Sequence, residues 1–211
     1  MKKILFPNEH GAWGMLTVAF LIGWLATPDF SLRPWFLVPA ALGGFLARYP
    51  LGIYFKKKRV ARSLQIPLSR EKNWFCLYSL FTFLVTIPLF YPLGWFWLLP
   101  LVMVSFLSFV GHLVAIVQRK ERTFFVEWSA MVGLSTLVPA AAYASILRWS
   151  LQPIILWVLF IGYYSWRIGA IRKKVAERRE KPVDLRKIGK RELFYSGLFV
   201  LAMIIASRIF D

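Results

Sequence analysis

The sequence has few acidic residues, a single cysteine and no long hydrophilic stretch. Its 211 residues include ten Asp and Glu against 27 Lys and Arg, which gives a formal net charge of +17. Only 18% of the residues are charged and 58% are hydrophobic, whereas soluble domains average about 45–50% apolar residues. A soluble fold of this size needs charge around its whole surface, so the composition favours an integral membrane protein.

Several kinds of catalytic site are also missing. The lone cysteine, Cys76, excludes an intramolecular disulfide framework and any site made from several cysteines. Neither the glycine-rich phosphate loop of nucleotide-binding proteins nor the HExxH zinc signature occurs. The three aspartates lie outside the apolar segments, which disfavours a Ser/His/Asp triad. We therefore expect no metal and no cofactor; a haem or metal between His10 and His112 is the alternative.

Seven apolar segments are long enough to cross a membrane. A spanning helix needs about 20 mainly apolar residues, with a range of about 17–25. The segments are 10–27, 34–55, 74–90, 94–117, 124–147, 151–170 and 193–210. The sequence therefore predicts an all-α fold, a polytopic transmembrane bundle of about seven spans that forms one domain over residues 1–211.

The basic residues gather in alternate connections. Connections 56–73, 118–123 and 171–192, together with Lys2 and Lys3, hold 22 of the 27 Lys and Arg residues. Because basic loops stay on the cytoplasmic side of a membrane, seven spans predict a cytoplasmic N-terminus and an outside C-terminus. This distribution accounts for the positive charge without nucleic acid. The expected partners are the lipid bilayer and its anionic phospholipids.

Small residues and prolines within the apolar segments bear on packing. Gly43 and Ala47, and likewise Ser129 and Gly133, stand four positions apart, a spacing that lets helix backbones approach closely. Prolines also lie inside the segments, where kinks can line cavities; we single out Pro39, Pro100 and Pro139. Ordinary packing with tolerated kinks is the alternative.

Ionisable residues inside a membrane are costly unless they are paired or hydrated, so they indicate functional sites. Arg48, His112, Glu127 and Arg167 lie within apolar segments. A helix rises 1.5 Å per residue, so the distance of each residue from the neighbouring basic connection can be estimated. It is about 12 Å for Arg48, about 9 Å for His112, and about 7 Å for both Glu127 and Arg167. The four residues therefore occupy one slab of the membrane.

We interpret these four residues, with Glu9 and His10 at the start of the first segment, as ligand-binding residues of one polar cavity open to the cytoplasm. The arginines would bind an anion, and Glu127 would supply a counter-charge. The histidines would make polar contacts. Alternatively, the arginines extend to the lipid head groups and each histidine makes one structural hydrogen bond.

Residues 7–14 read PNEHGAWG. This octamer resembles the start of the YwiC-like membrane proteins of bacteria. The resemblance implies a multi-pass protein of the bacterial cell (inner) membrane.

A more distant resemblance is to the UbiA-type prenyltransferases, helical bundles with a cytoplasmic active site. RYPL at 48–51 and PLSRE at 67–71 are similar to the end of that family's second helix and the loop after it. Those enzymes hold a diphosphate through Mg²⁺ on clustered aspartates. Residues 49–54 and 168–174 contain no acid here, so the resemblance implies a UbiA-like bundle without the metal-dependent mechanism.

Two functions of different classes follow. The protein binds an isoprenoid, a quinone or an anionic lipid in its cavity, or it is a metal-independent transferase acting on a lipid or prenyl phosphate. In the transferase, arginine and lysine side chains would replace Mg²⁺, and His10 or Glu127 would be the catalytic acid or base. A small-molecule transporter ranks third, because the chain has no evident internal repeat.

Overall fold

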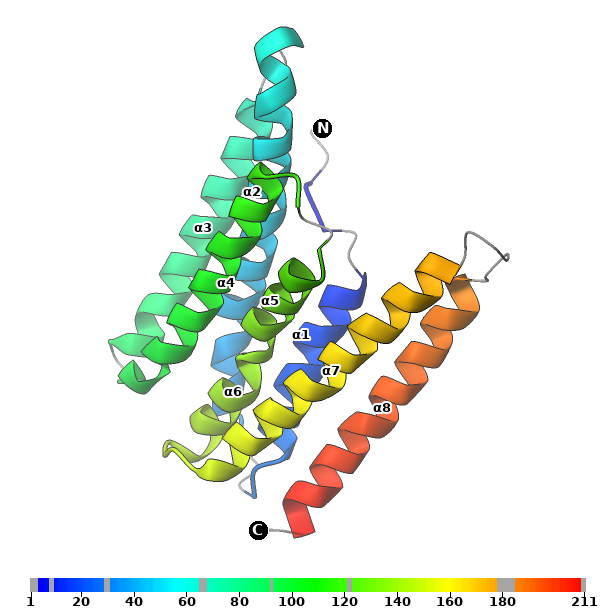
Figure 1. Cartoon of the computed structure of the whole chain (residues 1–211). Coiled ribbons are helices and arrows are strands. Elements are labelled where there is room, and N and C mark those ends of the chain that lie inside the picture. The colour runs from blue at the N-terminus through cyan, green and yellow to red at the C-terminus, as the bar shows by residue number, and fades with distance from the viewer. Residues whose placement is uncertain are drawn as a thin grey trace.

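A computed structural model describes residues 4–7, 10–28, 31–64, 68–91, 93–120, 123–177 and 185–209. These residues form α-helices and two short 3-10 helices, without a strand, and the prediction of an all-α bundle is confirmed (Figure 1). The elements are α1 (His10–Leu25), η1 (Arg33–Phe36), α2 (Leu37–Leu64), α3 (Ser69–Phe90), η2 (Phe96–Leu98), α4 (Leu99–Val117), α5 (Phe124–Ser135), α6 (Leu137–Ile146), α7 (Leu151–Glu177) and α8 (Leu185–Ile209).

The helices match the length and apolarity that a membrane requires. Five stretches of the described chain are long and apolar enough to cross it: Arg33–Lys58, Ser69–Phe90, Phe96–Val117, Phe124–Ile146 and Leu151–Lys173. Gly11–Leu25 in α1 and Phe194–Ile209 in α8 are apolar but shorter.

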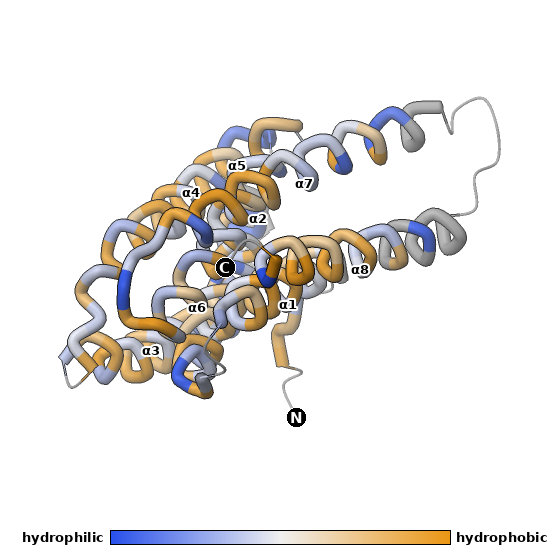
Figure 2. The backbone as a smooth tube through the Cα atoms, turned by 90° about the horizontal axis from the view of Figure 1, so that it is seen from below, coloured by the Kyte–Doolittle hydropathy of each residue, from blue (hydrophilic) through white to orange (hydrophobic). Residues whose placement is uncertain are grey.

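The outer surface of the bundle is apolar over wide areas. α3, α4, α7 and α8 expose large hydrophobic side chains along their lengths, among them Phe83, Leu107, Val158 and Leu201. Figure 2 shows the corresponding orange stretches of these helices. Water-soluble monomers rarely expose so much contiguous apolar surface, whereas a bilayer accommodates it. The chain is a multi-pass integral membrane protein.

Helices continue into stretches that the sequence analysis assigned to connections. α2 runs to Leu64 and α3 begins at Ser69, so most of 56–73 is helical. Likewise, α7 ends at Glu177 and α8 begins at Leu185. Apolarity marks only the part of a helix that crosses the hydrocarbon, and lysine and arginine are good helix formers. The basic residues therefore extend the helices beyond the membrane.

The three prolines singled out in the sequence lie at helix starts and do not kink helix interiors. Pro39, Pro100 and Pro139 each fall in the first turn of a helix, where the amide hydrogen that proline lacks has no intrahelical partner. Pro139 also cannot donate to the carbonyl of Ser135, four residues earlier. This missing bond explains why the fifth apolar segment is divided into α5 and α6 at Thr136.

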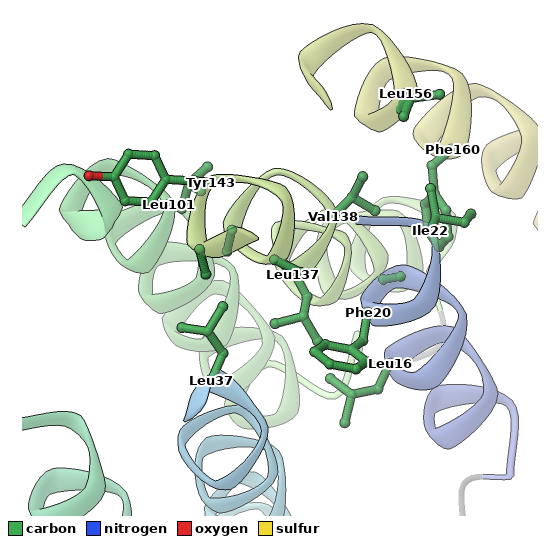
Figure 3. Close-up of a cluster of buried hydrophobic side chains, with 14 of the residues drawn as sticks. Leu16, Phe20, Ile22, Leu37, Leu101, Leu137, Val138, Tyr143, Leu156 and Phe160 are labelled. Carbon is green, nitrogen blue, oxygen red and sulfur yellow. The ribbon is translucent and has the colours of Figure 1, made fainter. Parts of the chain in front are cut away.

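The core surrounds α6. Residues 137–145 of this helix are all buried, and Figure 3 shows α1, α2, α4 and α7 contributing side chains around it. Gly23 of α1 makes this packing possible, because a methyl group there would overlap the carbonyl oxygen of Val138. The predicted contacts of Gly43 and Gly133 also occur, against Thr82 of α3 and Ser108 of α4.

The ends of the helices sort into two groups. α2, α4 and α7 end, and α3, α5 and α8 begin, at the upper end of the bundle in Figure 1. We call this the basic end, because it carries Lys56, Lys58, Lys120 and Arg172. α1, α3, α6 and α8 end, and α4 and α7 begin, at the opposite end.

Candidate functional site

A cavity of about 500 Å³ lies near the basic end, between α1, α2, α4, α5 and α7. Its walls combine ionisable, aromatic and aliphatic side chains with the open backbone of glycine. The lining residues are Pro7, Gly11, Ala12, Met15, Phe45, Arg48, Tyr49, Gly52, Ile53, Lys56, His112, Ile116, Glu127, Ala130, Met131, Leu134 and Ile168.

One helix face supplies the positive charge of the cavity. Arg48 and Lys56 are eight residues apart on α2 with Gly52 midway, and residues at four-residue intervals lie on one side of a helix. A methyl group on Gly52 would come within 3.1 Å of Ile116 Cδ1. The glycine therefore allows α2 and α4 to approach closely between the two cations.

The opposing wall carries His112 from α4 and Glu127 from α5. Glu127 lies in the first turn of α5, where the partial positive charge of the helix N-terminus favours an anion. Its Oε2 accepts a hydrogen bond from Arg172 Nη1 at 3.1 Å, and both side chains are about 40% exposed. This ion pair connects α5 to α7 beside the cavity.

The remaining wall is apolar and adaptable. Met15, Phe45, Met131, Leu134 and Ile168 come from four different helices. Methionine side chains fill irregular space because their three rotatable bonds adjust to the neighbouring groups. The cavity therefore combines a charged side with one that suits a flexible hydrocarbon.

The residues before α1 hold one edge of the cavity in place. Tyr78 donates its hydroxyl hydrogen to the carbonyl of Leu5 at 3.1 Å, and Trp13 Nε1 donates to the carbonyl of Pro7 at 3.2 Å. The Trp13 ring packs edge-on against Phe45, with 4.8 Å between ring centroids. These contacts fix Pro7 at the cavity wall.

The structure brings part of the predicted ligand-binding set together. Arg48, His112 and Glu127 line the cavity, as the depth argument predicted for them. Glu9 lies outside the described residues. His10 is described only as the first residue of α1, next to the cavity-lining Gly11.

Arg167 departs from that prediction. It does not line the cavity but a second pocket, between α7 and α8, and it is only 8% exposed. Arg167 shares the depth of the other residues but faces a different way around its helix. The neighbouring Ile168 takes the position toward the cavity.

Sequence reasoning missed three residues of this region. Lys56 and Tyr49 line the cavity, and the eight-residue spacing from Arg48 was a usable signal for Lys56. Glu71, the one acid of connection 56–73, is 1% exposed, and its Oε1 accepts a hydrogen bond from Lys57 Nζ at 2.7 Å. The sequence could have indicated this ion pair, because Glu71 is a single acid in a strongly basic stretch.

Within the described part of the chain, no three His, Cys, Asp or Glu side chains gather in a way that could hold a metal ion. The polar side of the cavity instead offers two cations, one acid, one histidine and the Tyr49 hydroxyl. These groups can bind an anion and exchange hydrogen bonds with a polar head group.

Comparison with known proteins identifies one family. A family model described as YwiC-like protein matches residues 6–142, which include α1 through most of α6 and the cavity residues Arg48, His112 and Glu127. No curated protein and no solved structure matches the chain. The match covers more than half of the chain, and the protein therefore belongs to the family of YwiC-like proteins.

Proposed function

We propose that the protein binds a membrane lipid with an anionic or strongly polar head, such as an isoprenoid, a quinone or an anionic lipid, in the cavity between α1, α2, α4, α5 and α7. The observation that carries this proposal is that the cavity lining combines the cations Arg48 and Lys56 with apolar side chains from four helices. An amphipathic molecule can contact both kinds of side chain at once.

The charge of the cavity favours an anionic head. Arg48 and Lys56 are about 12 Å apart along the axis of α2, as 1.5 Å per residue requires. Glu127 already pairs with Arg172 at 3.1 Å, so its charge is partly compensated by a residue outside the cavity lining. Arginine binds phosphate and carboxylate groups through parallel hydrogen bonds, and lysine adds a mobile point charge.

The size and the apolar side favour a hydrocarbon tail. The volume of about 500 Å³ falls within the range of about 300–1,000 Å³ that is usual for small-molecule sites. Met15, Phe45 and Met131 would contact the first part of the tail. A purely soluble anion would leave this wall without a partner.

We further propose that the cavity faces the cytoplasm of a bacterial cell. The support is the distribution of charge, because 22 of the 27 Lys and Arg residues belong to the N-terminus and the three basic connections. Basic segments remain on the cytoplasmic side during membrane insertion. Anionic lipid heads would then meet the cavity at the membrane surface.

A metal-independent transferase is a second candidate. The observation in its favour is that Glu127 and His112 line the same cavity as Arg48 and Lys56. A carboxylate or imidazole could move a proton while the cations stabilise a phosphate leaving group. Product formed from a prenyl phosphate and an acceptor, and lost in Glu127→Gln, would distinguish this enzyme from a binding protein.

Mass spectrometry of co-purified lipids tests the binding proposal. Arg48→Gln removes a cation of the cavity, whereas the control Lys58→Gln removes an exposed cation ten residues further along α2. We expect one lipid species to be enriched with the wild-type protein and with Lys58→Gln, and depleted about tenfold with Arg48→Gln, as the loss of a charge-assisted contact predicts. Identical lipid profiles in all three preparations would contradict the proposal.

A further inference from the structure

A second pocket lies between α7 and α8. Its volume is about 610 Å³, and Tyr163, Trp166 and Arg167 of α7 face Arg191, Tyr195 and Leu198 of α8 across it. We call this pocket the α7–α8 groove. It shares no lining residue with the cavity described above.

We propose that the α7–α8 groove is a separate binding site for an anionic phospholipid of the bilayer, with the lipid phosphate between Arg167 and Arg191 and an acyl chain along Leu198 and Ala202. This site is independent of the proposed function of the cavity.

Aromatic rings hold the first arginine in position. The guanidinium carbon of Arg167 is 5.3 Å from the centroid of the Trp166 ring and 5.2 Å from that of Tyr195. Contacts of a cation with aromatic faces orient the guanidinium without neutralising its charge. Arg167 is 8% exposed, so the side chain is ordered before a ligand arrives. A ligand then costs little additional side-chain entropy.

The two arginines lie on either side of the level at which the apolar stretches of α7 and α8 meet the basic end. The apolar part of α8 begins at Phe194. Arg191 comes three residues earlier, so it lies about 4.5 Å outside the apolar part along the helix axis. Arg167 is six residues inside Lys173, the last residue of the apolar stretch of α7, a depth of about 9 Å. A phosphate between them would lie just below the membrane surface, where the heads of phospholipids are found.

Hydrogen bonds attach α8 to the rest of the bundle at the end away from Arg191. At this end, Arg208 donates to the carbonyls of Pro28 and Leu25 at 3.2 Å, and Gln152 donates to the carbonyl of Ser207 at 2.9 Å. Midway, the rings of Tyr163 and Phe199 stack with centroids 3.9 Å apart. Figure 1 shows α8 running beside α7 at the edge of the bundle.

A phospholipid fits this groove better than a soluble anion does. Beyond Arg191 and Tyr195, the lining continues through Leu198 and Ala202, which are exposed on the outer surface of α8. In the membrane these side chains face hydrocarbon, so an acyl chain can continue from the phosphate along them. Arg191 and Arg167 then supply charge-assisted hydrogen bonds to the phosphate oxygens.

Lipid association can be measured with the full-length protein in phosphatidylcholine nanodiscs. The probes are spin-labelled phosphatidylglycerol and spin-labelled phosphatidylcholine, read by electron paramagnetic resonance. The variants are Arg191→Gln and Arg167→Gln, and the control is Lys173→Gln, which removes an exposed cation of α7 outside the groove. Arg191 is exposed, so Arg191→Gln tests the site even if Arg167→Gln does not fold.

We expect the wild-type protein to prefer phosphatidylglycerol. Arg191→Gln should weaken its association about tenfold, the factor for one charge-assisted contact. Lys173→Gln should weaken the association of phosphatidylglycerol by about twofold or less, because an exposed cation outside the groove attracts anionic lipids only through the overall surface charge. Equal effects of the two substitutions, equal association of both lipids, or full displacement of the labelled lipid by glycerol phosphate would each overturn the proposal.

Discussion

The two ends of the bundle are built on different principles. At the end away from the basic connections, α6 is buried along residues 137–145, and α1 packs closely against it at Gly23. At the basic end, the continuation of the same apolar segment, α5, borders the cavity with Ala130, Met131 and Leu134. Close packing of small residues stabilises the first end, whereas the second retains charged groups that cannot pack closely. The closely packed region and the cavity are therefore separated along the helix axis.

The largest effect on folding is expected from closing the space at Gly23. Gly23→Ala places a methyl group against the Val138 carbonyl, a backbone atom that cannot move aside. We expect the free energy of unfolding to fall by about 2–3 kcal/mol, as for other overpacked cores. Unfolding in detergent, followed by tryptophan fluorescence, measures this change.

Gly162→Ala is the matched control for Gly23→Ala. Gly162 lies on the exposed face of α7, and a methyl group there would have no neighbour within 4 Å. It should leave stability unchanged or raise it slightly, because alanine favours helix more than glycine does. If both substitutions changed stability by the same amount, close packing at the α1–α6 crossing would not be what stabilises this end.

The hydrogen bonds of two tryptophans differ in burial between the two ends of the bundle. Trp157 Nε1 donates to Ser135 Oγ at 2.8 Å beside the α5–α6 junction, and Trp128 Nε1 donates to Ser165 Oγ at 2.9 Å nearer the basic end. Ser135 is fully buried, whereas Ser165 is only partly buried. Trp157→Phe should therefore lower the free energy of unfolding by about 1–2 kcal/mol. Trp128→Phe should lower the free energy of unfolding by less. If Trp128→Phe lowered it by more than Trp157→Phe does, the end opposite the basic end would not be the more tightly packed one.

The buried ion pair of the α2–α3 hairpin gives an intermediate effect at the basic end. Glu71→Gln keeps the shape of the side chain but removes the charge that Lys57 contacts at 2.7 Å. Because the Lys57 side chain is 42% exposed and can reach water, we expect a loss of only about 1 kcal/mol. The exposed neighbour Lys72 provides the control Lys72→Gln. A thermal melt of both variants decides whether the pair stabilises the hairpin at all.

Hydropathy alone located seven apolar segments that are helical in the described chain, because hydrocarbon requires long apolar segments with internally satisfied backbones. It could not locate the ends of α2, α3 and α8, where helical hydrogen bonds continue among basic residues beyond the apolar part. It also placed Pro100 and Pro139 in the interior of spans, because composition does not reveal where a helix begins.

The sequence predicted how deep the site residues lie along their helices, but not which way their side chains face. Counting residues along each helix correctly placed Arg48, His112 and Glu127 at one level. The direction that each side chain takes around its helix depends on how the helices pack, and no spacing within one segment encodes it. Arg167 therefore entered the predicted set although it faces the α7–α8 groove.

The smallest effect on stability and the largest on binding are expected at Arg48. Removing a cation from a cavity that is not closely packed should change the free energy of unfolding of the lipid-free protein by about 0.5 kcal/mol or less. A ligand that binds only the folded state adds stability in proportion to the logarithm of its concentration relative to the dissociation constant. The variant should lose that addition.

The most direct test is the thermal unfolding of delipidated wild-type protein and Arg48→Gln, each with and without the lipid extract of its own membrane. We expect the same midpoint for both lipid-free proteins and a clearly larger upward shift with extract for the wild type than for Arg48→Gln, which keeps only the α7–α8 groove. An equal shift in Arg48→Gln would contradict a lipid head group bound at the cationic face of the cavity.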